Sequence, residues 1–303
     1  MPNGQKGIIL FCANEPGICV LEVILKTKLS ISCVITESNR ATSRLKYLAE
    51  NNKIPIIIDP NLDNISIFRD IIEKKDSIIL SASYPKKIPI NILSIFNGMA
   101  YNLHPARLPQ YRGCLPTIWP ILNGDEEAEY TLHIMKEDFD KGGLIDQISV
   151  KIQKHDNGFT LYKKLLDILP KLVIRNLSSL LKGEFKYTEQ NEKESRYYKN
   201  TLPNNGIINW SWDSVKIHRF IRALYHPLYP SAKAIINDYE IEFLEINTPT
   251  KTISPTKPGL LEILDNKLYI SCLDAWISPK KLKINGEIIS QNNYNTEIFK
   301  LLL

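Results

Sequence analysis

Asn102 and His104 stand two positions apart at the end of a short apolar run, residues 99–103. If that run is a β-strand, the two side chains point to the same face and can converge on one reacting group. The asparagine amide can donate a hydrogen bond to a developing oxyanion, and the imidazole can accept or donate a proton near neutral pH. The pair is therefore a candidate for acyl transfer, although a histidine that only satisfies a turn would look the same.

A carboxylate, Asp140, follows in a polar loop that ends in Gly142-Gly143. A carboxylate beside an imidazole can orient the ring and favour its cation, as in a catalytic triad. An acid before two glycines also fits an ordinary solvated turn, so Asp140 is a candidate only together with Asn102 and His104. The spacing of His104, His133 and Asp140 matches no standard metal site, and no metal is expected.

Tyr111 and Arg112 lie in a turn, Pro109-Gln110-Tyr111-Arg112-Gly113, shortly after His104. A guanidinium group suits a phosphate or a carboxylate because it can donate two parallel hydrogen bonds. The same residues fit a surface turn in which the tyrosine ring stacks on the arginine. The sequence leaves these two interpretations of Arg112 open.

Five apolar runs alternate with segments of helical spacing over the first hundred residues, which predicts a parallel α/β sheet. The expected strands are residues 8–12, 31–35, 54–58, 78–82 and 99–103, and the expected helices are 18–25, 44–51, 65–72 and 90–96. Ligands of open parallel sheets bind at the carboxyl ends of the strands. Asn102, His104 and the segment Ser81–Tyr84 all lie at such ends.

The remainder of the chain divides at a polar segment, residues 182–205. Before it we expect a short helix at 117–123, strands at 130–135 and 144–152, and a long helix at 159–181. After it we expect a helix at 213–224 and short strands at 232–236, 241–246, 259–264 and 267–272. The sequence thus predicts a catalytic domain over 1–205, and a linker helix with a small β domain over 206–303.

Composition excludes several classes of protein. The 303 residues are 44% hydrophobic, with a net charge of +5 and no concentrated basic face, so no nucleic-acid partner is expected. Five cysteines without a Cys-x-x-Cys pair indicate reduced thiols in a cytoplasmic protein. No apolar run approaches the ~20 residues that span a bilayer, and no membrane partner is expected. No Gly-x-Gly-x-x-Gly follows the first strand, so a dinucleotide site is unsupported.

Taken together, these motifs resemble the signature of the 10-formyltetrahydrofolate-dependent formyltransferases. The matching residues are Asn102-Leu103-His104-Pro105, Leu108-Pro109-x-Tyr111-Arg112-Gly113, Pro116, Asn123-Gly124 and Met135-x4-Asp140-x-Gly142, and further on Ile207-x-x-Trp210, Ile221-Arg222-Ala223 and Pro230-x-Ala232. Ala106 departs from the pattern, since a small hydroxyl residue is commoner there. The superfamily includes methionyl-tRNA formyltransferase, glycinamide ribonucleotide transformylase and the sugar N-formyltransferases. The resemblance implies a Rossmann-like α/β domain followed by a small, mostly β domain.

The resemblance also implies a reaction and its residues. An acceptor amine attacks the formyl carbon of the folate, Asn102 and protonated His104 stabilise the oxyanion, and Asp140 holds the imidazole and helps to move the proton. The co-substrate is 10-formyltetrahydrofolate, and no metal is implied. The pterin is expected to lie against the end of the fourth strand and the loop around Asp140, at Ser81, Ala82, Ser83, Tyr84, Phe139 and Gly142.

The resemblance is greatest to the sugar N-formyltransferases. The expected acceptor is a nucleotide-linked amino-dideoxy sugar, dTDP-linked, made for O-antigen or another surface polysaccharide. The residues expected to bind it are Tyr111, Arg112, Trp119, His133, Tyr197, Tyr198 and Lys199. Two alternatives stay open, namely a methionyl-tRNA formyltransferase and a folate-binding relative without turnover. By analogy with the family, a homodimer is expected.

Overall fold

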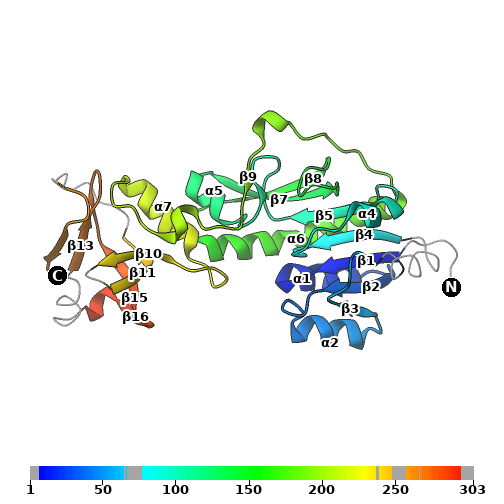
Figure 1. Ribbon diagram of the computed structural model, residues 1–303, viewed down its shortest axis with the longest axis horizontal. Helices are drawn as coiled ribbons and strands as arrows, with labels where there is room; N and C mark the ends of the chain where they lie inside the picture. Colours follow the sequence, from blue (N-terminus) through cyan, green and yellow to red (C-terminus); the bar gives the residue numbers. More distant parts are fainter. Residues whose placement is uncertain are drawn as a thin grey trace. The chain divides into compact units, whose positions relative to one another are not determined.

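The computed structural model describes residues 7–64, 66, 77–236, 239–247, 257–265 and 267–294 (Figure 1). Contacts divide the chain into two units. The first comprises Met1–Pro116, Ala128–Val150 and Lys163–Lys199, and the second comprises Thr117–Glu127, Lys151–Tyr162 and Asn200–Leu303. The boundary predicted from the sequence, between residues 205 and 206, stays a prediction.

A seven-stranded sheet with the order β3-β2-β1-β4-β5-β7-β8 forms the first unit. Neighbours from β3 to β5 pair in parallel, whereas β7 pairs with β5 antiparallel. The strands are β1 (Gly7–Cys12), β2 (Ile31–Thr36), β3 (Ile56–Ile58), β4 (Ser77–Ala82), β5 (Ala100–His104), β7 (Glu127–Ile134) and β8 (Leu144–Lys151). Strand order reverses between β1 and β4, and ligands of such sheets bind at the carboxyl ends near this reversal.

Helices follow the strands of the first unit, as the sequence predicts. They are α1 (Asn14–Leu25), α2 (Ser43–Asn51), α4 (Ile90–Ile95) and α6 (Gly158–Lys182), the last of which continues through Pro170. The hydroxyl of Thr42 accepts a hydrogen bond from the Leu45 N–H, which satisfies one of the free donors at the start of α2. The helix predicted over residues 65–72 falls almost wholly outside the described residues.

A hydrophobic core packs the apolar face of the sheet against α4 and the residues before it. Ile9, Phe11, Ile35 and Ile79 come from the strands, and Ile92 comes from α4. All five side chains are fully buried. Full burial of such a side chain stabilises the fold by about 1.5–3 kcal/mol. This core fixes the carboxyl ends of β4 and β5, where the candidate residues lie.

The second unit combines two helices with two small sheets. Helix α7 (Ser214–Leu224) packs on α5 (Ile118–Asn123) and on β11, and its first turn is capped by the Asp213 carboxylate, which accepts from the Lys216 N–H at 2.7 Å. The sheets have the orders β10-β11-β15-β16 and β12-β13-β14. Their strands are β10 (Ala232–Ile236), β11 (Tyr239–Ile246), β12 (Leu261–Leu264), β13 (Lys267–Ser271), β14 (Trp276–Ile277), β15 (Pro279–Ile284) and β16 (Glu287–Ser290).

The predicted fold class is confirmed: a Rossmann-like α/β sheet precedes a smaller, mostly β region. The sequence-based strands all appear within a few residues of their expected bounds. The strands β14, β15 and β16 were not predicted, nor were the two-residue strands β6 (Arg112–Gly113) and β9 (Tyr197–Tyr198). Over the described part of the chain, no helix is both long and apolar enough to cross a membrane.

Candidate active site

Strand β5 and its neighbour β7 place three candidate side chains on one face of the sheet. Asn102 and His104 alternate along β5, and the antiparallel register sets Asn102 directly opposite His133 on β7. Side chains directly opposite each other in such a pair are close enough to interact. The Asn102 Nδ2 accordingly lies 3.1 Å from the His133 Nε2.

Asp140 reaches the same face from the loop after β7. Its Oδ1 lies 3.6 Å from the His104 Nδ1 and 3.5 Å from the His133 Nε2, and its Oδ2 accepts from the Gly113 N–H at 2.8 Å. Burial alone would raise the pKa of Asp140, but the charge of His104 and the hydrogen bond from the Gly113 N–H hold that pKa well below its usual range. The carboxylate is therefore ionised at neutral pH.

The two nitrogens of His104 both face hydrogen-bond acceptors. Nε2 donates to the Tyr111 carbonyl at 2.8 Å, and Nδ1 faces the Asp140 carboxylate. A carbonyl and a carboxylate can only accept, so the imidazolium form, with a proton on each nitrogen, suits this site best. The arrangement gives His104 a proton on Nδ1, beside the cavity.

His133 contacts the other two candidates as well as the backbone. Its Nδ1 donates to the Ile134 carbonyl at 2.8 Å, which leaves Nε2 of the neutral ring to accept from the Asn102 amide. That contact holds the Asn102 side chain with its nitrogen toward β7. His133 was expected to bind the acceptor; the structure brings it beside Asn102 and Asp140, where it lines the cavity.

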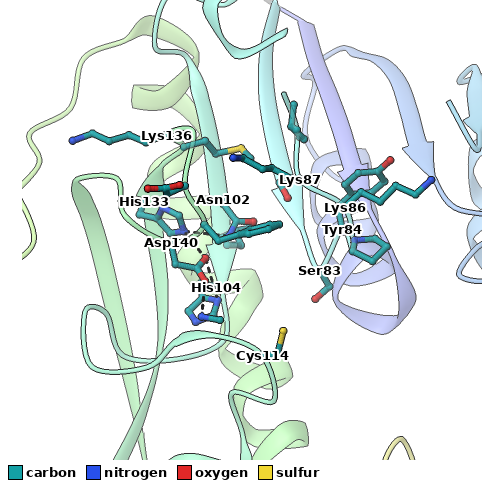
Figure 2. Close-up of a pocket in the computed structure, with 18 of the residues that line it drawn as sticks. Ser83, Tyr84, Lys86, Lys87, Asn102, His104, Cys114, His133, Lys136 and Asp140 are labelled. Atoms are coloured by element: carbon teal, nitrogen blue, oxygen red, sulfur yellow. Dashed lines mark hydrogen bonds and ion pairs between the residues drawn. The ribbon is translucent and has the colours of Figure 1, made fainter. Parts of the chain in front are cut away.

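A cavity of about 320 Å³ opens above these residues (Figure 2). Asn102, His104, His133 and Asp140 form one side of it, and Ser83, Tyr84, Lys86 and Lys87 form the other. Its lining also includes Ser81, Leu103, Cys114, Met135, Phe139 and Tyr197. The structure thus brings together the three predicted catalytic residues and most of those predicted to face a pterin.

The wall after β4 is held by a buried carboxylate that sequence reasoning missed. Glu37, at the end of β2, accepts from the Tyr84 hydroxyl at 2.5 Å and forms an ion pair with Lys86. Burial and the Glu37 carboxylate raise the pKa of Tyr84, so this hydroxyl stays protonated and donates. Ser83 has a left-handed backbone, with φ of 59°. These contacts fix the course of the chain from Ser81 to Tyr84.

Several predicted site residues lie outside the lining of this cavity. Ala82 is fully buried within the sheet, Tyr111 stacks on Tyr198 with ring centroids 5.8 Å apart, and Lys199 is exposed. Trp119 lies half-buried on α5, in the second unit. Their predicted roles in binding the acceptor stay predictions.

Arg112 is buried and hydrogen-bonded within the chain. Its guanidinium donates to the side chains of Gln190 and Glu192, and it is 3% exposed. It also lines a second hollow, of about 340 Å³, with Phe139, Lys141 and Arg196 among the other residues. The sequence suggested bidentate contacts for this arginine, and the partners that the structure gives it are side chains of the protein.

Cys114 lines the cavity but is poorly suited to act as a nucleophile. Burial raises the pKa of its thiol, and the nearby Asp140 carboxylate raises it further. Because the thiolate is the reactive form, the thiol is largely inert at neutral pH. Among the described residues, no group of three or more His, Cys, Asp or Glu side chains is arranged to hold a metal ion.

An amide donor, an imidazole with a carboxylate partner and a cavity at the carboxyl edge of an α/β sheet define an enzyme site of the acyl-transfer type. Comparison with known families narrows this class. The formyl transferase profile matches residues 19–177, and the profile of the formyl transferase C-terminal domain matches residues 202–296. The chain belongs to the formyl transferase family.

Similar proteins differ in their acceptors. The bifunctional polymyxin resistance protein ArnA of Wigglesworthia glossinidia brevipalpis is 31% identical over 88% of this chain, which spans 43% of that protein's length. The methionyl-tRNA formyltransferase of Buchnera aphidicola is 27% identical over 89% of this chain and 88% of its own. Among solved structures, one similar fold is that of the sugar 3N-formyl transferase WlaRD, crystallised with dTDP and 5-N-formyl-THF. The two chains are 24% identical, with a TM-score of 0.71, and the match covers 94% of this chain and 100% of WlaRD.

Gly142 is required by the close approach of two backbone segments, and its replacement gives a first prediction. A Cβ added there would lie 1.6 Å from the Ile134 carbonyl oxygen, which belongs to β7. Gly142→Ala is expected to displace the Asp140 loop and to lower the free energy of unfolding by roughly 2 kcal/mol or more. Urea unfolding measures this change. The control is Gly98→Ala, whose Cβ would meet no atom within 4 Å and which carries only the roughly 1–2 kcal/mol cost of a left-handed φ of 80°. A loss in Gly142→Ala no larger than that in Gly98→Ala would contradict the steric explanation.

Proposed function

We propose that this protein transfers a formyl group from 10-formyltetrahydrofolate to the amine of a nucleotide-linked amino sugar. The observation that carries the proposal is the convergence of Asn102, His104 and Asp140 on one cavity, in a chain of the formyl transferase family. The acceptor nitrogen forms a bond to the formyl carbon, the bond from that carbon to the folate nitrogen breaks, and the amine proton passes to the departing nitrogen.

The cavity fits a flat heteroaromatic ring. Ser81 and Ser83 present small side chains at the end of β4, and Ile88, Leu103 and Met135 add apolar surface. Phe139, 44% exposed, supplies an aromatic face at the same cavity. We assign Ser81, Ser83, Tyr84 and Phe139 to the folate, with Ala82 and Gly142 shaping the backbone on either side. The folate supplies the formyl carbon and a nitrogen leaving group.

The residues of the chain then have distinct roles. Asn102 has a second amide hydrogen beyond the one that contacts His133, and this hydrogen can bind the developing oxyanion. Since the Nε2 of His104 is engaged by the Tyr111 carbonyl, we assign proton transfer to Nδ1. Asp140 keeps that nitrogen protonated and stabilises its charge.

The second hollow supports an anionic acceptor. It shares Asp138, Phe139 and Tyr197 with the first cavity, and Lys141 and Arg196 bring cationic groups to it. A diphosphate is recognised by such groups, and Tyr197, 57% exposed, offers a ring for a nucleotide base. The fold likeness to WlaRD favours a dTDP-linked sugar, and surface polysaccharide synthesis, O-antigen included, is the process that we propose for the product.

Methionyl-tRNA formyltransferase is the second candidate, because the Buchnera enzyme matches this chain over nearly its whole length. An assay separates the two acceptors. With 10-formyltetrahydrofolate as donor, the protein is offered dTDP-, UDP- and GDP-linked amino sugars in parallel with methionyl initiator tRNA. We expect a formylated sugar nucleotide, detected by mass. Formylation of the tRNA alone would reject the sugar acceptor while keeping the formyl transfer.

A further inference from the structure

Gln190 lies in the segment after α6, and its side-chain amide is fully hydrogen-bonded. Its Nε2 donates to the carbonyls of Asp140 at 2.6 Å and Gly142 at 2.7 Å. Its Oε1 accepts from the Nε and Nη2 of Arg112, at 3.0 and 2.8 Å. A primary amide has two donor hydrogens and two acceptor lone pairs, so every capacity of Gln190 is used.

The partners also fix which way this amide faces. Arg112 can only donate, so it must face the oxygen, and the two carbonyls can only accept, so they must face the nitrogen. Gln190 is 9% exposed and Arg112 is 3% exposed, so water competes little for these bonds. A buried donor or acceptor left without a partner is costly, which opposes rotation of the amide.

Arg112 and Gly113 hold Asp140 in two ways, Gly113 by a direct hydrogen bond and Arg112 through Gln190. The Gly113 N–H donates to the Asp140 carboxylate, and the Arg112 side chain holds the Asp140 carbonyl through Gln190. These two residues form the short strand β6 (Arg112–Gly113), which pairs in parallel with β9 (Tyr197–Tyr198). The backbone and the side chain of Asp140 are therefore anchored to the same two-residue strand.

Asp140 needs such support because its backbone is strained. Its φ is 59°, in the left-handed region that is unfavourable for a residue with a Cβ. The Asp140 Oδ1 must nevertheless stay within ion-pair distance of His104. A shift of about 1 Å in a catalytic group can cost on the order of 100-fold in rate.

We propose that Gln190, supported by Arg112, is a positioning residue that holds the Asp140 carboxylate in register with His104. This inference rests on the formyl-transfer function proposed above and adds two residues whose side-chain hydrogen bonds are made within the chain. Arg112 then acts within the chain, through Gln190, in place of the direct contact with the acceptor that its motif suggested.

The test is a nearly isosteric substitution, Gln190→Glu. The new carboxylate still accepts from Arg112, so the fold is retained, but it cannot donate to the carbonyls of Asp140 and Gly142 and repels them. We expect kcat for formyl transfer to fall about 30- to 100-fold, with KM for both substrates within about threefold of wild type. The melting temperature should fall by a few degrees, because two buried carbonyls lose their donor. Lys186→Glu, at an exposed position of the same segment, is the matched control and keeps the wild-type kcat.

A second readout does not depend on turnover. Ring-nitrogen NMR resonances of His104 and His133, assigned from His104→Asn and His133→Gln, report the distance and charge of Asp140 directly. Gln190→Glu is expected to shift both, whereas the rings of His155, His218 and His226 stay unchanged. A wild-type kcat in Gln190→Glu, or unmoved His104 and His133 resonances, would overturn the positioning role. Shifted resonances in a protein that formylates no acceptor would support the positioning role and reject the proposed function instead.

Discussion

His104→Asn is expected to lower kcat/KM for formyl transfer by about 10³-fold or more. The substitution removes the imidazole whose Nδ1 faces Asp140 and carries the proton in the proposed reaction. Acid–base groups of this kind raise reaction rates by about 10²–10⁴-fold. The ring's hydrogen bond to the Tyr111 carbonyl is lost, at a net cost of about 1 kcal/mol, and so is the charge that faces the Asp140 carboxylate, which keeps its bond from the Gly113 N–H. The melting temperature should therefore fall by several degrees without a loss of the fold.

The matched control is the same substitution at an exposed histidine, His155→Asn, which is expected to leave both quantities at their wild-type values. Initial rates over a range of both substrates, with thermal melts on the same samples, provide the comparison. Near-native turnover in His104→Asn would refute the role given to this imidazole. A collapse of the melting temperature would instead place His104 in the structural core.

Much of the α/β fold is readable from the sequence because its strands are buried on both faces. β1 and β4 are buried at every position, and each appears in the sequence as an uninterrupted or nearly uninterrupted apolar run. Two strands of the second unit, β15 and β16, were not predicted, for a different reason. β15 and β16 form a hairpin around Asn285-Gly286, a turn dipeptide typical of hairpins. However, β15 is interrupted by three lysines and β16 has only four residues, none of them buried, so the apolar pattern is weak.

The convergence of Asn102 and His104, the candidate catalytic residues of β5, was accessible to sequence reasoning because local geometry decides it. Two alternate positions at a strand end must share a face, and Asn102 and His104 do. Gln190 gave no such signal, since it lies 50 residues from Asp140 in a polar segment without periodicity. Only the folded chain, through the β6–β9 pairing, brings it to the Asp140 loop. The same pairing explains why the bidentate chemistry of Arg112 was recognised but its partners were not.

Asp140→Asn is expected to lower kcat by on the order of 10³-fold while keeping the shape of the site. An asparagine oxygen can still accept from the Gly113 N–H, but the new amide nitrogen donates toward His104. Because the Nε2 of His104 already donates to the Tyr111 carbonyl, the ring would settle as the neutral tautomer with Nδ1 accepting. The proton that the reaction needs at Nδ1 would then be absent. Asp167→Asn, at an exposed position on α6, is the control and keeps full activity.

A comparison of the wild type with Asp140→Asn also predicts how the free energy of unfolding depends on pH. Burial opposes ionisation of Asp140, yet His104 and the Gly113 N–H lower its folded-state pKa below the unfolded value of 3.8. A lowered pKa contributes stability that is present above the unfolded pKa and is lost as the pH falls through and below it. The free energy of unfolding of the wild type, measured by urea titration, should therefore fall more steeply below about pH 4 than that of Asp140→Asn. Parallel curves for the two proteins would mean that the carboxylate gains nothing from its neighbours, and the assignment of a protonated His104 would fail with it.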